Sequence, residues 1–381
     1  MSDERKRLFI GAGIGHLHSI ILAFAFFLPL FYLNSLGLTL VVYATLFVVG
    51  DVFAFALKPF VGYLTDKYGE GLLLTATSAV FFISLFLIGQ TTSLGVLATL
   101  RVANAVSGSI MFILVIIYGL RMVNSNPDYK VGLFNAIKNG GWIVGLSIFL
   151  YFFNIKGLGL SAAFYLILIL GIVWTAFTYS YTRKINFRSK ISLKPSLSYL
   201  KRIPLFMSIK TLDLAMFTAF VIFFIPLARD ELGLPRTIIT IVVIVELIAF
   251  VGSNYLVGRF SNKSRRKYLI PIGILGHLLA GLTMLLATDL IHYFMVGIFI
   301  GIAGGFVDVW LFSRISESVK TEEKGKFLGT VGWSWDLGTI VGGLFPVGMI
   351  LIGLNQFVAL LLIPGLMAVS YLTARIKNSE P

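Results

Sequence analysis

The residues most able to do chemistry in this sequence are ionisable side chains inside long apolar segments. Each such charge would cost roughly 2.5–3.5 kcal/mol at the centre of a bilayer, so we expect it to face a cavity or a partner of opposite charge. The first half of the chain carries three of the bases, and the second half carries four of the acids. This distribution favours attraction between the halves across a central cavity, or a ligand carrying both signs. The acids are Asp51, Asp213, Glu246, Asp308 and Asp336, and the bases are Lys58, Arg101, Lys138 and Lys210.

All five acids are candidates for proton coupling. A carboxyl group in a low-dielectric environment can exchange protons near neutral pH, which is what such a site requires. Asp51, Glu246 and Asp336 lie near the middle of their segments and are the first choices. The alternative for each acid is a structural ion pair between the halves. For Asp213 that alternative is the stronger one, because Lys210 lies three residues earlier on the same helical face.

A second group of side chains could contact a solute in the cavity. Arg101 and Asn104 share a helical face, and Lys138 has Trp142 four residues further on, at the spacing of a cation–π contact. Packing inside the bundle is the alternative for every member. The candidates are His16, Arg101, Asn104, Lys138, Asn139 and Trp333.

Three further residues carry specific expectations. His16 and His18 point about 200° apart on a helix, and we expect His16 to face the cavity. Trp333 lies on the face of Asp336 and could stack on a ring-shaped solute. Lys58 comes near the end of its segment, and we expect it to extend towards the membrane surface.

The elements that would position these residues are apolar helices. The chain is 57% hydrophobic and 13% charged, whereas soluble domains carry about 25% charged residues, so a water-soluble globule is excluded. A helical span needs roughly 20 apolar residues. We therefore expect an all-α membrane protein with twelve transmembrane helices, and we expect the first to stay as an anchor and not be cleaved. The segments are 8–33, 39–61, 71–90, 94–120, 132–153, 158–181, 205–228, 237–257, 268–288, 290–313, 327–352 and 356–374.

The basic residues between these segments predict the orientation. Nearly all of them lie in alternate connections on the side of the N-terminus, and only Lys156, Arg229 and Arg236 lie in the others. The positive-inside rule then places both termini in the cytoplasm, in a plasma-membrane protein. The net charge of +14 is thus a topology signal and not a sign of nucleic-acid binding. With no cysteine and four histidines, we expect no metal and no cofactor.

The two halves of the chain repeat each other. Residues 36–39 (LGLT) correspond to residues 232–235 (LGLP), and Gly145 corresponds to Gly338. Such matches at nearly constant spacing indicate a duplication. We expect an N-terminal six-helix bundle at 1–181, a basic cytoplasmic linker at 182–204 and a C-terminal six-helix bundle at 205–381.

A short motif occurs after the second apolar segment of each half. The first copy reads Gly62-x-x-x-Asp66-Lys67-x-Gly69, and the second reads Gly258-x-x-x-Asn262-Lys263-x-Arg265-Arg266. The first copy resembles the loop signature of the major facilitator superfamily, and Arg101, Asn104 and Gly108 partly match its span-four arginine motif. The second copy departs by having Asn for Asp. The resemblance implies two pseudo-symmetric six-helix bundles and a cytoplasmic gate built from Gly62, Asp66, Lys67, Gly69, Gly258, Asn262, Arg265 and Arg266. A plain capped turn is the alternative.

The resemblance also implies a function, which is secondary transport of a small molecule by alternating access, by a monomer in a lipid bilayer. Protons, or sodium in their place, would drive it. A polar solute such as a sugar, organic acid or amino acid is favoured by the nine buried charges. Efflux of lipophilic or cationic drugs is the alternative, favoured by the aromatic content. A non-transporting membrane sensor or assembly partner comes next. We expect no enzyme, because no nucleotide loop, metalloprotease motif or nucleophile elbow occurs.

Overall fold

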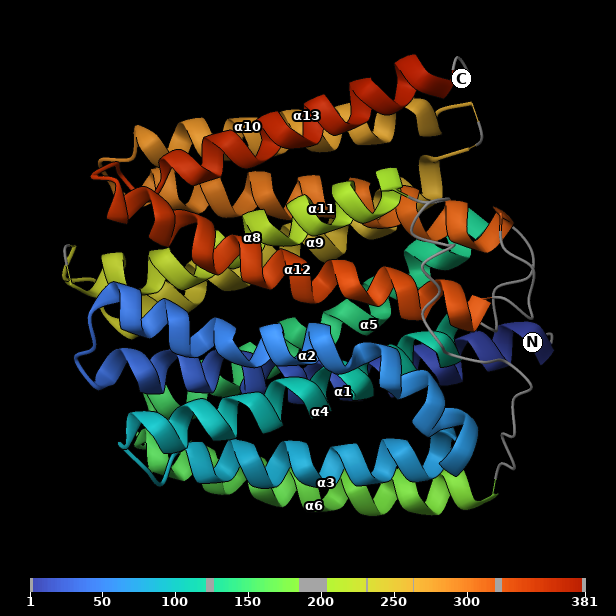
Figure 1. The fold of residues 1–381 in the computed structure, drawn as a ribbon, viewed down its shortest axis with the longest axis horizontal. Helices are drawn as coiled ribbons and strands as arrows, with labels where there is room; N and C mark the ends of the chain where they lie inside the picture. The colour runs from blue at the N-terminus through green and yellow to red at the C-terminus, as the bar shows by residue number, and fades with distance from the viewer. Residues whose placement is uncertain are drawn as a thin grey trace.

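A computed structural model of the chain consists of long helices (Figure 1). It describes residues 3–120, 127–184, 204–230, 232–262, 264–318 and 324–378, and these contain no strand. The first half contributes α1 (Asp3–Ser35), α2 (Leu40–Tyr68), α3 (Glu70–Ile88), α4 (Leu94–Leu120), α5 (Pro127–Phe149), the π-helical turn η1 (Leu150–Ile155) and α6 (Leu160–Lys184). The second half contributes α8 (Pro204–Asp230), α9 (Arg236–Phe260), the 3₁₀ turn η2 (Arg266–Tyr268), α10 (Leu269–Leu285), α11 (Leu290–Ser318), α12 (Lys324–Leu351) and α13 (Val358–Asn378).

Every predicted apolar segment overlaps one of these helices. Eleven of the described helices are long and apolar enough to cross a membrane, and α13 contains a shorter apolar stretch, Val358–Ala374. The outer faces are apolar as well, since Ile172, Val173 and Val369 are each 62% exposed. Large exposed side chains of this kind suit contact with lipid, where no water penalises them. The prediction of an all-helical, multi-pass membrane protein is confirmed.

The helices of the two halves occupy different parts of the molecule. In Figure 1, α1–α4 and α6 lie in the lower part, and α8–α13 lie in the upper part. Contacts between the halves are made above all by α5 with α9 and by α2 with α12. We call the side on which α1 begins and α13 ends the termini side (right in Figure 1). The predicted linker 182–204 falls almost entirely outside the described residues, so the domain boundaries stay a prediction.

The sequence repeat has a structural counterpart. Gly37 follows α1 with φ 66°, and Gly233 follows α8 with φ 61°. A positive φ is strained for residues with a Cβ, so both chain reversals depend on glycine at the same point of the repeat. Helix crossings repeat too: a Cβ added at Gly145 of α5 would meet the Ile20 backbone of α1, and one at Gly338 of α12 would meet α8. The pair α1–α5 thus corresponds to the pair α8–α12.

Candidate functional site

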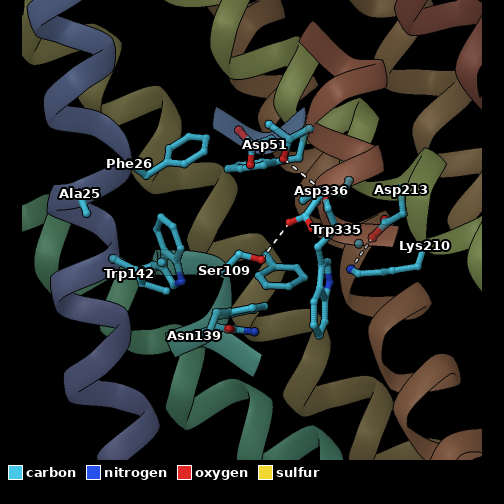
Figure 2. A pocket seen from close by; sticks show the side chains of 18 of the residues that line it. Ala25, Phe26, Asp51, Ser109, Asn139, Trp142, Lys210, Asp213, Trp335 and Asp336 are labelled. Atoms are coloured by element: carbon cyan, nitrogen blue, oxygen red, sulfur yellow. Dashed lines mark hydrogen bonds and ion pairs between the residues drawn. The ribbon is translucent and has the colours of Figure 1, made fainter. Parts of the chain in front are cut away.

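A cavity of about 290 Å³ lies between the two halves of the protein. Residues of α1–α5 and of α8–α12 line it, so both halves contribute to its wall. The structure places all five predicted acids here, together with Arg101, Asn104, Lys138, Asn139 and Lys210. Its size suits a small solute, because ligand pockets usually start at about 300 Å³. Figure 2 shows Asp51 and Asp336 in its upper part, with the pair Lys210–Asp213 to the right.

One charged cluster joins α2, α4 and α12. The Lys58 Nζ atom lies 2.6 Å from Asp336 Oδ2 and donates a second hydrogen bond, also 2.6 Å, to the carbonyl oxygen of Gly332. Ser109 of α4 donates to the other Asp336 oxygen at 3.0 Å. The expectation that Lys58 extends to the membrane surface is wrong, since the residue is 2% exposed. The carboxylate of Asp336 draws the side chain inwards, and an ion pair with two further hydrogen bonds offsets much of the cost of burying both charges.

Arg101 of α4 holds a second group of polar side chains beside this cluster. Its guanidinium donates to Asn104 Oδ1 at 3.0 Å and to the carbonyl oxygen of Phe47 at 2.8 Å. The Asp51 carboxylate lies 4.0 Å away, at the limit of an ion pair. Asn104 in turn donates to the carbonyl oxygen of Phe81 at 3.2 Å. These bonds hold Arg101 and Asn104 against the helix backbones, with Asp51 facing the cavity.

The second half contains its own charged cluster. Lys210 Nζ lies 2.8 Å from Asp213 Oδ2 and 2.7 Å from Asp308 Oδ1. The contact with Asp308 joins α8 to α11. His277 of α10 reaches the other Asp213 oxygen at 3.0 Å. The pair of Lys210 and Asp213 has the expected spacing, but His277 was missed. The single signal for it in the sequence is a lone histidine within an apolar segment, which does not by itself indicate an acidic partner.

Lys138 and Glu246 differ from the other charged residues of the cavity. Among the described residues, no carboxylate lies within 4.0 Å of Lys138 Nζ, which instead lies 5.4 Å from the centre of the Phe112 ring. The predicted cation–π partner, Trp142, is thus replaced by an aromatic residue of α4. Glu246 is 3% exposed, and its Oε2 atom has no hydrogen-bond partner in the described part of the chain.

Two predicted contact residues lie away from the cavity. His16 faces α5, and its Nδ1 lies 2.7 Å from the carbonyl oxygen of Ile137. The cavity wall contains Trp335 and not Trp333, whose ring packs 5.6 Å from that of Phe55. Two positions on a helix differ by about 200° in direction, which is why the neighbouring tryptophan takes the predicted place. His16 and Trp333 are thus not among the residues that line this cavity, and their contact with a solute stays a prediction.

Part of the predicted gate motif lies outside the described structure. Gly62, Asp66 and Lys67 belong to the last turns of α2, but the structure does not describe their surroundings, whereas Gly69 follows the helix with φ 83°. In the second copy, Asn262 Oδ1 accepts a 3.0 Å hydrogen bond from the backbone N–H of Arg265, as in a capped turn. Gly258 packs against Gly132 of α5, and Arg266 is 4% exposed. The gating role of these residues stays a prediction.

The fold and its charged central cavity define a multi-pass membrane protein of transporter architecture. The chain belongs to the Major Facilitator Superfamily, whose sequence profile matches residues 8–343.

Solved structures agree with this assignment. The human organic anion transporter MFSD10 (TETRAN) has a TM-score of 0.74 at 14% identity, covering 98% of this chain and 99% of that one. The proton:xylose symporter XylE, bound to 6-bromo-6-deoxy-D-glucose, has a TM-score of 0.71 at 12% identity, covering 99% and 97%. At such identities the likeness concerns the fold alone. A search of curated protein sequences found no significant match.

Proposed function

We propose that this protein is a secondary transporter that moves a small polar solute across the membrane by alternating access, coupled to protons. The observation that carries the proposal is the cavity between the halves, which has ionisable side chains of both signs on its wall. Binding sites at the interface of two repeats are the usual arrangement in such transporters. We expect a monomer in the plasma membrane, with both termini in the cytoplasm.

Contacts between the halves on both sides of the cavity support alternating access. Towards the termini side, Lys58 of α2 binds Asp336 and the Gly332 backbone of α12. On the opposite side, Arg229 at the end of α8 donates a 2.6 Å hydrogen bond to the carbonyl oxygen of Asn34 at the end of α1. Rocking one half against the other would separate one set of contacts while keeping the other. Each set can therefore act as a closure for its side.

Glu246 is the acid that we expect to bind the transported proton. Each of the other four acids lies within 4.0 Å of a base, whereas Glu246 has no such neighbour among the described residues. An ionised carboxylate buried without a partner costs several kcal/mol, and binding a proton removes that cost.

Export of lipophilic or cationic compounds is the second candidate function. Aromatic rings are frequent on the cavity wall, including Phe26, Phe112, Trp142, Phe217 and Trp335. A purely lipophilic solute, however, would leave the charge of Lys138 without a direct partner, and burying such a charge is costly. We therefore favour a polar solute.

The proposed function can be tested with purified protein in liposomes that enclose a pH-sensitive dye. Sugars, organic acids, amino acids and lipophilic cations are added in turn without an imposed gradient, in sodium and in choline buffers. A coupled solute should move protons in both buffers, and Glu246→Gln should abolish the signal. Asp289→Asn is the matched control, because Asp289 lies in the exposed connection before α11. There the hydrogen bond from the His292 backbone N–H lowers the pKa of its carboxyl.

Three results would count against the proposal. Solute flux that requires sodium would show that sodium, and not the proton, is the coupling ion. An unchanged signal in Glu246→Gln would exclude Glu246 as the coupling acid. Absence of any solute flux would contradict transport itself.

A further inference from the structure

Lys138 is a buried cation that faces the cavity, and no carboxylate of the described residues lies within 4.0 Å of it. It is 4% exposed, and it is the one base among the described intramembrane residues that contacts no acid. Burying an ammonium group costs several kcal/mol unless an anion or several acceptors compensate it. The ring of Phe112, 5.4 Å away, contributes only about 0.5–2 kcal/mol. A ligand that carries a negative charge would supply the missing partner.

The protein holds the side chain of Lys138 in place from α1. A Cβ atom added at Gly15 would lie 2.9 Å from Lys138 Cγ, so the absence of a side chain there makes room for the lysine stem. Asn139, the next residue along α5, also lines the cavity, and its Nδ2 donor has no partner among the described residues. Two donors without acceptors thus lie on one stretch of α5. Both could be satisfied by a ligand with two oxygen acceptors.

Lys138 and Glu246 lie on two helices that pack together and run in opposite directions. A Cβ at Gly132 of α5 would lie 2.7 Å from the Asn254 carbonyl oxygen and from Gly258 Cα of α9, which places Gly132 level with residues 254–258. Lys138 is then level with about residue 250. Glu246 lies one turn further, roughly 6 Å along the axis. The two residues therefore lie at similar depths in the helix bundle.

These two residues together give the cavity a simple charge balance. Binding of an anion at Lys138 together with a proton at Glu246 leaves the net charge of the cavity unchanged. Binding of the anion alone or of the proton alone shifts that net charge by one unit. Joint carriage of both therefore moves no net charge across the membrane.

We propose that the solute is a small monocarboxylate, bound through its carboxylate by Lys138 and Asn139 and carried together with one proton on Glu246, without net charge movement. This inference rests on the transport function proposed above and names its substrate class. A phosphate group carries about 1.5 to 2 negative charges at neutral pH and would exceed the single charge of Lys138. The aromatic wall formed by residues such as Phe112 and Trp335 suits an apolar body on the carboxylate.

Each of the other acids around these two residues lies within 4.0 Å of a base. Asp213 and Asp308 share the single base Lys210, so that cluster contains one acid in excess, and Asp213 also contacts His277. Across the cavity, Asp51 lies beside Arg101, and Asp336 binds Lys58. Lys138 and Glu246 are therefore the groups that remain for an anion and a proton.

The test compares each carboxylate with its neutral amide. Thermal unfolding of the purified protein is measured near neutral pH with butanoate, hexanoate and phenylacetate, with the three corresponding amides, and with phenethylamine and phenylalanine. A bound ligand raises the unfolding temperature by mass action. At least one carboxylate should raise it clearly more than its amide. Lys138→Met should abolish the difference, and Lys138→Arg should retain part of it.

Lys156→Met is the matched control, because the exposed Lys156 also lies over an aromatic ring, 5.6 Å from the centre of Tyr151, but outside the cavity. It should leave the shifts unchanged. Equal shifts for carboxylates and amides, a preference for phenethylamine, or no shift with any carboxylate would overturn the inference.

Transport measurements distinguish a failure of this inference from a failure of the proposed function. A neutral solute that moves protons through the wild-type protein, while carboxylates do not, would keep the transport function and reject the substrate class. Carboxylates that bind through Lys138 but never cross the membrane would keep the site and reject transport.

Discussion

Lys58 and Asp336 form an ion pair that joins the two halves of the protein on the termini side of the cavity. Lys58 Nζ lies 2.6 Å from Asp336 Oδ2, and the two side chains are 2% and 4% exposed. Asp336 also lines the cavity and accepts a hydrogen bond from Ser109. The same carboxylate therefore belongs both to the wall of the binding site and to the contact between α2 and α12. Changes of charge in the cavity can act on this contact directly.

The first prediction concerns the stability of this pair. Lys58→Met leaves the Asp336 carboxylate buried without its base, which should cost about 3–5 kcal/mol. We expect a clear fall in the unfolding temperature of the purified protein. The double variant Lys58→Met with Asp336→Leu replaces the pair by apolar side chains and should recover most of the loss. A single variant as stable as the wild type would show that the pair is not formed in the folded protein.

The second prediction concerns the position of Lys138. Gly15→Ala should displace the lysine stem, because the new Cβ would lie 2.9 Å from its Cγ. Losing one well-placed hydrogen bond to a charged group costs about 1.5–3 kcal/mol and should weaken binding by roughly tenfold or more. Calorimetric titration with the best carboxylate of the thermal series measures the effect. Gly13→Ala is the control, since a Cβ there meets nothing within 4 Å, and equal effects of both changes would count against the positioning role.

The third prediction separates exchange from net transport. Glu246→Gln fixes the cavity in the charge state of the protonated acid, so the loaded form keeps the charge of the loaded wild-type protein. Exchange of labelled for unlabelled carboxylate needs only the loaded form to cross, and it should persist. Net uptake driven by a pH gradient needs a proton to be bound and released in each cycle, which glutamine cannot do, so it should fall to the background of empty liposomes. Net uptake at the wild-type rate would contradict this role of Glu246.

The fourth prediction concerns the helix crossing behind Glu246. A Cβ added at Gly301 of α11 would overlap the carbonyl oxygen of Glu246. Gly301→Ala should therefore push α9 and α11 apart and lower the unfolding temperature, with a loss of about 1–3 kcal/mol. Gly252→Ala on α9 meets nothing within 4 Å and should be neutral or slightly stabilising. If both variants behave alike, the close crossing is not needed for stability.

Local patterns in the sequence predicted the helices and the repeat well. Runs of apolar residues mark the spans, and the matching positions Gly37 and Gly233 carry the same turn because turn geometry depends on nearby residues. The direction in which a side chain points from its helix is harder to predict. The cavity contains Trp335, whereas Trp333 was expected there.

Partners far apart in the chain were not predicted. Lys58 and Asp336, or His277 and Asp213, meet because distant helices pack together, and single-sequence spacing holds no information on such contacts. The pair of Lys210 and Asp213 was predictable because both residues lie on one helix.

The most direct test of the account is the charge carried per transport cycle. Proteoliposomes are given an inward pH gradient and a labelled monocarboxylate, while potassium and valinomycin clamp the membrane potential at zero or at about 100 mV of either sign. A net charge crossing the membrane would feel about 2.3 kcal/mol at 100 mV. Uptake that follows the pH gradient and is the same at all three potentials would support carriage of a carboxylate with one proton. Uptake that follows the potential, or persists unchanged without a pH gradient, would contradict it.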